Sequence, residues 1–229
     1  MPGQPPNGKW PQSAKKYALW LGIVLIVVAI SWAIWRFSLS RIEPNAGQTA
    51  AALLALAPTE RDWTRGPTEA HVTVVEYSDF QCPACRNFWQ ATNQLEKDFG
   101  GRFRFIYRHF PLDRIHPNAR SAAVAAEAAG QQERFWDYYQ ILYERQSDWK
   151  SATRVEVQFE RYARELGLDI QRFRKDFNDP SVRKKIMDDL RSGRKSGVES
   201  VPAFFVNGRR IDLPKTYADL KRLVGPESK

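Results

Sequence analysis

Cysteine is scarce in this chain. The 229 residues contain two, Cys82 and Cys85, separated by two residues. A disulfide between such close positions closes a very short loop, so it would add little entropic stabilisation as a structural staple. A tetrahedral metal site needs four ligands and the pair supplies two, with His71, His109 and His116 as candidates for the others. The pair therefore points first to redox chemistry, with metal binding as an alternative.

Long runs of one charge are also missing. The formal charge is +9, but residues 1–41 carry five basic residues and no acid, which leaves +4 for residues 42–229. A domain so mildly basic, without a run of Lys and Arg alone, is not typical of nucleic-acid binding. The sequence has no Walker A or G-x-G-x-x-G pattern, so no organic cofactor is indicated.

Charge is absent from residues 18–35, which read ALWLGIVLIVVAISWAIW. As a helix this run would extend roughly 27 Å, enough for a hydrocarbon core, and tryptophans lie near both of its ends. A cleaved signal peptide is the alternative, but its apolar region is normally shorter and no small-residue cleavage site follows Trp35. We therefore expect an uncleaved transmembrane anchor over residues 17–39, preceded by a disordered tail, residues 1–16.

Basic residues on either side of the anchor predict its orientation. Three lysines precede the apolar run and two arginines follow it, a weak positive-inside bias that places the N-terminus in the cytoplasm. The expected location is the cell membrane, crossed once. Everything after residue 40 would then lie on the extracytoplasmic or periplasmic side, where disulfides persist.

Strand and helix patterns alternate after a linker punctuated by Pro and Gly, residues 40–67. The β-branched run 71–77 predicts a buried strand, and 102–110, with its alternating aromatic residues, predicts a second. Residues 83–99 read as a helix with Pro at its first position and Gly-Gly at its end. The rest of the chain predicts a helical block (about 113–192), a hairpin turning at Asn207–Gly208 (203–212) and a final helix (216–224). Together these elements indicate an α/β core with a helical insertion.

Cys82 lies at the N-terminal end of the predicted helix. Unpaired backbone N–H groups and the positive end of the helix dipole favour a thiolate there, so we expect the pKa of the Cys82 thiol to fall to roughly 3.5 to 7. Cys85, one turn into the helix, is expected to be buried and to act as the resolving thiol. A stabilised thiolate stabilises the reduced form, which makes the disulfide more oxidising.

Several separate motifs, in order, resemble one family. They are EYSDFQCPAC (76–85), YRHFPL (107–112), HPNA (116–119), RFWDYY (134–139), ELGLD (165–169) and VPAFFVNG (201–208). Together they resemble the DsbA-like thioredoxin-fold oxidoreductases, over residues 68–225. The resemblance implies an α/β thioredoxin fold with an inserted helical domain, and thiol–disulfide exchange on protein substrates.

The resemblance also implies roles for individual residues. Cys82 would be the nucleophile and Cys85 the resolving cysteine. Val201 and Pro202, joined by a cis peptide bond, would form the loop that faces them. Glu76 would be a buried acid beneath the pair that helps to move the proton of Cys85. The alternative for Glu76 is a position at the surface or in a pair with a nearby Lys or Arg, because an unpartnered buried carboxylate is costly.

One departure from the family and the lack of further cysteines shape the predicted function. Strongly oxidising members usually carry histidine between the cysteines, where this chain has Ala84, so the redox strength is left open. Without another cysteine, electrons must pass to an external partner, which for this family is a membrane thiol oxidase. We expect a monomeric oxidoreductase that introduces disulfides into exported proteins with no cofactor beyond the Cys82–Cys85 disulfide. The alternatives are a reductase or isomerase, and a metal-binding chaperone using the same thiols.

Overall fold

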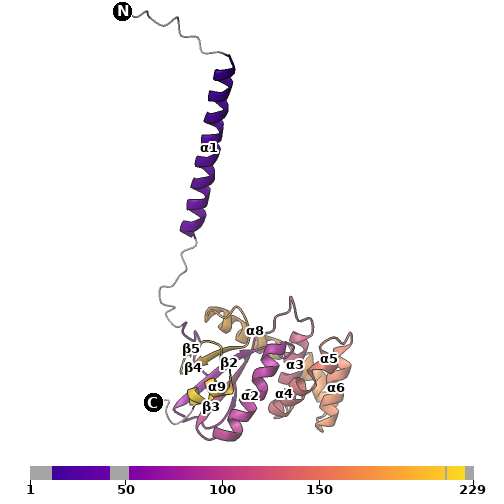
Figure 1. The fold of residues 1–229 in the computed structure, drawn as a ribbon. Coiled ribbons are helices and arrows are strands. Elements are labelled where there is room, and N and C mark those ends of the chain that lie inside the picture. Colours follow the sequence, from indigo (N-terminus) through magenta and orange to yellow (C-terminus); the bar gives the residue numbers. More distant parts are fainter. Residues whose placement is uncertain (1–11, 42–51, 215, 225–229) are drawn as a thin grey trace, which may run out of the picture. The chain divides into compact units, whose positions relative to one another are not determined.

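A computed structural model describes residues 12–41, 52–214 and 216–224. The chain divides into two compact units, residues 1–50 and 51–229. In the first unit, helix α1 spans Gln12–Arg41 (Figure 1). The helix therefore begins inside the tail that we expected to be disordered over residues 1–16, and residues 1–11 lie outside the described part. Ser13 to Lys16 contain no helix breaker, so the helix can extend through them.

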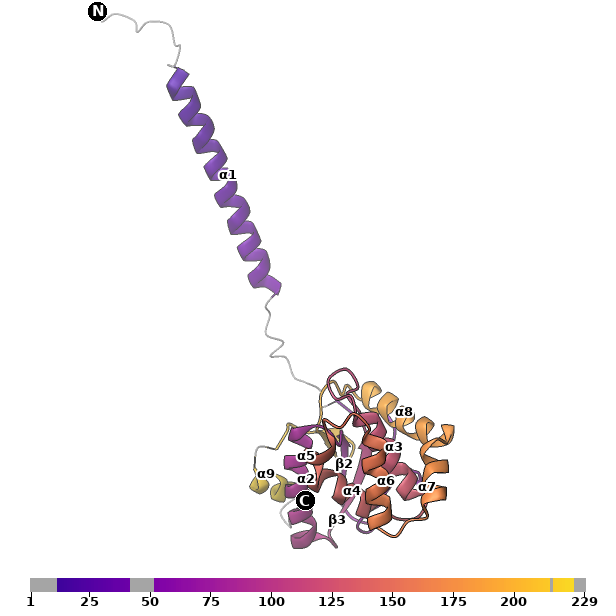
Figure 2. The same cartoon turned by 90° about the vertical axis from the view of Figure 1, so that its right-hand side faces the viewer.

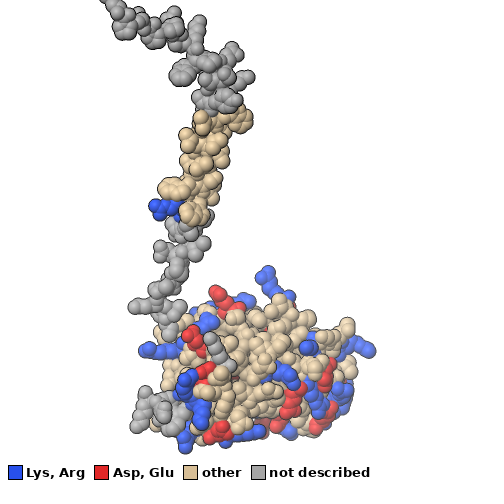
Figure 3. Space-filling model, in the orientation of Figure 1, with Lys and Arg blue, Asp and Glu red and all other residues tan. Residues whose placement is uncertain are grey.

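Between residues 20 and 36, helix α1 presents mainly apolar side chains to its surroundings. Its described side chains, residues 20–36, include Trp20, Leu25 and Trp35, each more than 60 % exposed. Figure 3 shows this stretch almost entirely uncharged, with basic atoms only near one end, and the sequence has a single charged residue there, Arg36. Within the described part of the chain, however, no helix combines the length and the apolar composition needed to cross a membrane. The predicted anchor over residues 17–39 is therefore not confirmed.

The second unit is built on a five-stranded sheet in the order β1-β3-β2-β4-β5. The central pair, β2 (Val72–Ser78) and β3 (Phe103–His109), runs parallel and is connected by helix α2 (Pro83–Phe99), as the sequence predicted. Strand β4 (Ala203–Val206) pairs antiparallel with β2 and turns into β5 (Arg209–Arg210). The predicted hairpin turn is confirmed, because Asn207 and Gly208 both have positive φ angles, 47° and 79°.

The helical block predicted over about 113–192 lies between β3 and β4 in the chain. Figure 2 shows its helices gathered together beside the sheet. The bounds are α3 Ala119–Gly130, α4 Phe135–Glu144, α5 Gln146–Trp149, α6 Val155–Glu165, α7 Ile170–Phe177 and α8 Pro180–Lys195. The final helix, α9, spans Tyr217–Val224. The sequence prediction of a helical insertion in an α/β core is confirmed.

Each face of the sheet has its own hydrophobic core. Val74 and Phe105 face a core that α2, α3, α4 and α9 cover, and this core includes both cysteines. Val75 and Ile106, the next residues along the same strands, face a second core that α8 covers. Because side chains alternate across a strand, Glu76 lies on the same face as Val74. Its carboxyl group is therefore directed to the side of the sheet that carries Cys82 and Cys85.

The segment predicted to be a linker, residues 40–67, is part of the domain from residue 52 on. Strand β1 (Trp63–Arg65) pairs antiparallel with β3 and forms the edge of the sheet. Leu53 forms a bridge to Arg209 at the opposite edge. Among the described Gly and Pro residues of this segment, Gly66 has a positive φ of 80° and the Pro67 carbonyl accepts from the N–H of Ala70, so both mark the turn that follows β1. Short edge strands have little periodicity, so the sequence pattern did not reveal them.

Candidate active site

The two cysteines lie at the start of α2, as predicted. Cys82 is the N-cap residue, with Pro83 in the first turn, and Cys85 is completely buried one turn later. Both thiols are free. The Cys82 Sγ lies 3.8 Å from the carbonyl oxygen of Val201. The peptide bond between Val201 and Pro202 is cis, so the loop implied by the family resemblance does face Cys82.

The two thiols differ strongly in acidity. The hydrogen bond from Cys85 and the backbone N–H groups of Cys85 and Ala84 lower the pKa of Cys82 to about 6, against the effect of burial. Burial raises the pKa of Cys85 well above its usual value, and the neighbouring Cys82 raises it further. At neutral pH, Cys82 is therefore mainly a thiolate and Cys85 a thiol. This is the division between a nucleophile and a protected resolving group.

Glu76 is buried beneath the pair, with 1 % of its surface exposed. Among the described residues, its Oε2 has no hydrogen-bond partner. Burial raises the pKa of Glu76 to about 8, although Ser78 opposes this with a hydrogen bond. The alternative of a surface position or a pair with a basic residue is wrong. Near neutral pH, Glu76 is thus a protonated acid that can still give up its proton.

Three tyrosines surround this acid, and sequence reasoning did not identify them. Tyr107 is opposite Glu76 on the neighbouring strand, and Tyr139 and Tyr143 come from α4. The ring centroids of Tyr107 and Tyr139 are 5.3 Å apart, and those of Tyr139 and Tyr143 are 5.1 Å apart. The Tyr143 hydroxyl lies 2.9 Å from that of Ser78. The available signal was the spacing of four residues in α4, which places both rings on one helix face.

Side chains from the helical block hold the loop that carries the cysteines. Gln146 donates to the carbonyl oxygens of Phe80 and Cys82, at 2.7 and 3.0 Å. Gln81 donates to the Lys150 carbonyl and accepts from the Asn118 N–H, both at 2.7 Å. These contacts join residues 37 to 69 positions apart. No local sequence pattern could have predicted them.

The histidines considered as metal ligands have other partners. His109 Nε2 lies 2.9 Å from Glu127, inside the domain. His116 Nδ1 lies 2.7 Å from Asp79. His71 precedes β2, at the end of the strand away from the cysteines. The residues that the structure describes contain no group of three or more Cys, His, Asp or Glu side chains arranged to hold a metal ion.

Two of the pockets that the described residues line differ in their chemistry. The first, about 510 Å³, is lined by apolar residues of α2 and of the C-terminal segment, including Phe88, Leu213 and Leu220. Phe88 lies one turn after Cys85 on α2 and packs against Phe204, with ring centroids 5.3 Å apart. Phe80 and Trp89, which also flank the cysteines in the sequence, are core residues. Phe88 thus contributes an apolar ring to a groove that lies further along α2 from the cysteines.

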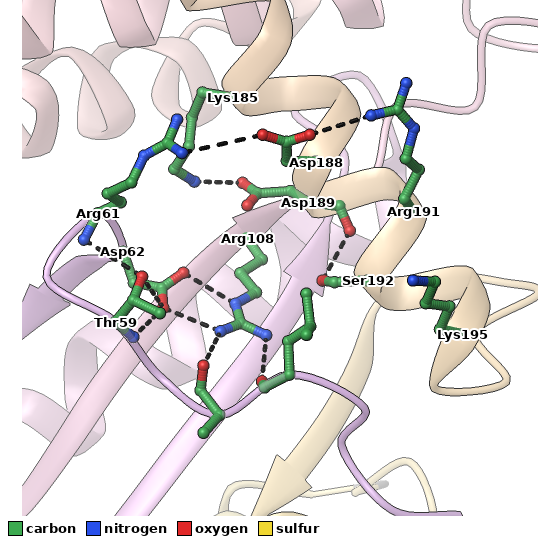
Figure 4. Close-up of a pocket in the computed structure, with 12 residues that line it drawn as sticks. Thr59, Arg61, Asp62, Arg108, Lys185, Asp188, Asp189, Arg191, Ser192 and Lys195 are labelled. Atoms are coloured by element: carbon green, nitrogen blue, oxygen red, sulfur yellow. Dashed lines mark hydrogen bonds and ion pairs between the residues drawn. The ribbon is translucent and has the colours of Figure 1, made fainter.

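The second pocket, about 410 Å³, lies beside α8 and contains buried charges (Figure 4). Arg108 donates to both carboxylate oxygens of Asp62, at 2.8 and 2.9 Å. It also donates to the carbonyl groups of Leu56 and Ala57 and to the Tyr77 hydroxyl. All five N–H groups of Arg108 therefore have partners within the protein. Its role is to hold residues 56–62 against β3.

Comparison with known proteins places this site in a family. The thioredoxin family profile matches residues 58–225. A thioredoxin-like oxidoreductase from Silicibacter pomeroyi DSS-3 has a similar structure, with a TM-score of 0.63 and 26 % identity over 77 % of this chain and 96 % of that one. BdbD from Bacillus subtilis, in its oxidised form, has a TM-score of 0.65 and 22 % identity, over 75 % of this chain and 96 % of that one. Wolbachia pipientis α-DsbA1 has a TM-score of 0.66 and 21 % identity, over 74 % of this chain and 92 % of that one.

Curated relatives carry a different name. Na⁺/H⁺ antiporter NhaA 3 of Salinispora tropica is 37 % identical over 215 residues, covering 89 % of this chain and 32 % of the relative. Na⁺/H⁺ antiporter NhaA 1 of Mycolicibacterium gilvum is 35 % identical over 206 residues, covering 88 % of this chain and 32 % of the relative. The chain therefore spans about a third of the length of these relatives. With the family match, the sheet topology and the cysteine pair in agreement, the chain belongs to the thioredoxin family, with DsbA-like oxidoreductases among its structural neighbours.

Proposed function

We propose that this chain is a thiol:disulfide oxidoreductase that introduces disulfides into exported proteins. The observation that carries the proposal is the contrast between the two thiols of one Cys-Pro-Ala-Cys motif. Cys82 has a pKa lowered to about 6, whereas the pKa of the buried Cys85 is raised. The stabilised thiolate favours the reduced enzyme, which makes the disulfide a good oxidant. The redox group is the cysteine pair itself, and the reaction needs no other cofactor.

The exchange proceeds in two steps from the Cys82–Cys85 disulfide. A substrate thiolate attacks Cys82 Sγ, so that a mixed disulfide forms and the bond to Cys85 breaks. Cys85 leaves with the electron pair and takes up a proton. A second substrate thiolate then attacks the substrate sulfur of the mixed disulfide and releases Cys82 as a thiolate. The substrate loses two electrons to form its disulfide, and the enzyme pair gains them.

Glu76 supplies the proton that Cys85 needs. A pKa raised to about 8 leaves this carboxyl group protonated at neutral pH, so it can act as a general acid when Cys85 leaves. The reverse transfer, from Cys85 to the Glu76 carboxylate, activates Cys85 during reoxidation. The proposal gives Glu76 a proton-transfer role and not a role in holding the fold.

The loop at Val201–Pro202 and the apolar groove bind the substrate chain. Pro202 has no N–H and the Val201 carbonyl faces Cys82, so an extended segment can place its cysteine at the nucleophile. The groove at Phe88 and Leu213 takes apolar side chains of the same segment. An exported protein that has not yet folded offers both features.

The proposal places the domain outside the cytoplasm. The uncharged run 18–35 supports an anchor over residues 17–39, and the three lysines that precede it support an N-terminus in the cytoplasm. A membrane thiol oxidase then takes up the two electrons from the reduced pair, since the chain has no third cysteine. The curated relatives are named as ion antiporters, but they are about three times as long as this chain. We assign function from the site and not from those names.

The reduction potential of the Cys82–Cys85 pair tests the proposal. The 229-residue chain, purified in mild detergent, is equilibrated with glutathione buffers, and the Cys82→Ser variant is the control. A potential near about −120 mV, as in strongly oxidising family members, supports an oxidase. A value near about −270 mV identifies a reductase and rejects the oxidase. Tight stoichiometric binding of Zn²⁺ or Cu⁺ to the reduced chain, lost in Cys82→Ser, would favour the metal chaperone.

A further inference from the structure

Asp79 is the most connected polar residue of the loop that carries the cysteines. It follows β2 directly and is 2 % exposed. Its Oδ1 accepts from the N–H of Gln81 at 2.7 Å, and its backbone oxygen accepts from the N–H of Cys82 at 3.1 Å. Both contacts shape the tight turn that leads into α2. Asp79 therefore sets the position at which Cys82 enters the helix.

The other carboxylate oxygen of Asp79 binds a distant segment. Its Oδ2 accepts from the N–H of Leu112 at 2.9 Å and lies 2.7 Å from Nδ1 of His116. Because an ionised carboxylate can only accept hydrogen bonds, Nδ1 of His116 carries the hydrogen in this contact. The His116 side chain is 15 % exposed, whereas that of Asp79 is fully enclosed. The pair thus connects a buried charge beside Cys82 to the protein surface.

This charge has a direct consequence for the nucleophile. A carboxylate next to a thiolate disfavours the thiolate, and Asp79 indeed raises the pKa of Cys82 against the larger effect of the Cys85 hydrogen bond. Hydrogen bonds from Leu112 and His116 distribute the carboxylate charge and so weaken this repulsion. Family members that oxidise strongly usually place a histidine between the cysteines, where this chain has the exposed Ala84. His116 reaches the same loop from a separate segment.

We propose that Asp79 and His116 are a pair of positioning residues that sets the redox strength of the Cys82–Cys85 disulfide, with Asp79 weakening it and His116 restoring it. The inference rests on the proposed function, because it assigns a control to that same disulfide. Neither residue touches the substrate or gains electrons. Each acts through the charge and the loop geometry that Cys82 experiences.

Opposite effects from the two partners distinguish this role from a merely structural one. In Asp79→Asn the charge is lost, while the side-chain oxygen can still accept from Gln81, so the pKa of Cys82 falls and the disulfide becomes more oxidising. In His116→Leu the donor is lost, so the pKa of Cys82 rises and the disulfide becomes less oxidising. We expect the equilibrium constant with glutathione to change about threefold to tenfold in each case. His116→Asn, which keeps an N–H donor near the position of Nδ1, should restore the wild-type value.

Gln81→Leu is the matched control. It removes the contacts to Lys150 and Asn118 from the same loop without changing a charge. Any change of the Cys82 pKa in this variant measures the effect of disturbing the loop alone, and we expect it to be smaller than the changes in Asp79→Asn and His116→Leu. Thermal unfolding of all the variants shows which of them keep the fold. If Asp79→Asn does not fold, a less oxidising disulfide in His116→Leu together with the wild-type value in His116→Asn decides the test.

Two quantities are measured on the 229-residue chain: the ultraviolet absorbance of the Cys82 thiolate against pH, and the equilibrium constant with glutathione. Shifts of opposite sign in Asp79→Asn and His116→Leu support the pair. Shifts of the same sign, or shifts no larger than those of Gln81→Leu, overturn it. The thiolate titration does not depend on the redox direction, so it still decides the inference if the wild-type potential rules out the oxidase.

Discussion

Glu76 and Tyr107 lie opposite each other on the two central strands, and both have a buried oxygen without a hydrogen-bond partner among the described residues. An unpaired buried polar group is costly, so a position that keeps two of them side by side usually has a functional reason. In the proposed function that reason is proton transfer. Hydrogen bonds that held the Glu76 carboxylate would lower its pKa and would remove its ability to protonate Cys85 near neutral pH.

The Glu76→Gln variant tests this role in catalysis. The change keeps the size and polarity of the side chain but removes the ionisable proton, so we expect disulfide exchange at neutral pH to slow by about tenfold or more. Stopped-flow oxidation of a reduced two-cysteine peptide measures the rate. Tyr139→Phe, which removes a neighbouring buried hydroxyl without an acid, is the control. A Glu76→Gln rate equal to that of the wild type across the pH range would discard the proton-transfer role.

Glu76 should also make stability depend on pH, in a predictable direction. Its pKa is raised from the ordinary value of 4.5 to about 8 in the folded protein. Between these values the folded state holds a proton that the unfolded state releases, so a rise in pH from about 4.5 to about 8 destabilises the folded wild type. The stability advantage of Glu76→Gln over the reduced wild type should therefore grow across this window. Urea unfolding at several pH values measures it, and a constant difference would contradict the prediction.

Cys82 should react as a thiolate well below the pH at which an ordinary thiol does. With a pKa lowered to about 6, its alkylation by iodoacetamide should reach half its maximal rate near that pH. The Cys85→Ser variant isolates this reaction. When its Cys82 thiolate attacks a disulfide of a substrate protein and releases one substrate thiolate, the mixed disulfide should accumulate, because Cys85 is not there to resolve it. Cys82→Ser should be nearly unreactive in the folded state, since Cys85 is completely buried. Equal labelling of the two single-cysteine variants would argue against the assignment of the nucleophile.

The apolar groove makes a separate prediction about substrate binding. Leu213 lines it and is 47 % exposed. We expect Leu213→Ser to raise the KM for an unfolded protein substrate several-fold, with little change in the glutathione equilibrium, because the cysteines are untouched. Val157→Ser, which also replaces an exposed apolar residue but lies on α6, is the control. If both variants raise KM to the same extent, the groove is not the binding surface.

The buried ion pair of Asp62 and Arg108 should matter for stability and not for redox chemistry. Although burial opposes it, the hydrogen bond from Arg108 lowers the pKa of Asp62. Removing one partner leaves the other charge buried, so we expect Arg108→Met to cost about 3–5 kcal/mol in unfolding free energy. The double variant Arg108→Met with Asp62→Leu should be less destabilised than Arg108→Met alone. Denaturant unfolding measures both, and an equal or greater loss in the double variant would show that the uncompensated charge is not the cause.

The sequence predicted the central part of this fold because its signals are local. Strand 71–77, helix 83–99 and the turn at Asn207–Gly208 each follow from periodicity or turn chemistry within a few residues. Cys82, Cys85 and the Val201–Pro202 loop were also found, the last through the family resemblance. The predicted linker was wrong from residue 52 on. Trp63 is held in the domain by contacts with residues far along the sequence, and no local pattern indicates such contacts. Its ring stacks on Phe135 with centroids 4.2 Å apart, and its Nε1 donates to Glu127.

The polar framework of the site could not be predicted, for the same physical reason. Asp79 resembles an ordinary turn residue in the sequence, and His116 resembles a loop residue. Their importance depends on a contact that spans 37 positions and on the burial of one partner. Likewise, nothing near Gln146 in the sequence indicates that it binds the backbone on both sides of Gln81.

The contacts of Gln146, Gln81 and Asn118 limit how the cysteine motif can be transferred to another protein. A chimera that moves residues 76–85 onto a minimal scaffold without the inserted helices would keep the motif but lose the donors and acceptors that hold it. The inserted helices therefore cannot be removed or exchanged without losing the contacts that hold the motif. A redesign that aims to retune the disulfide has to transplant the motif and its supporting helices as one piece.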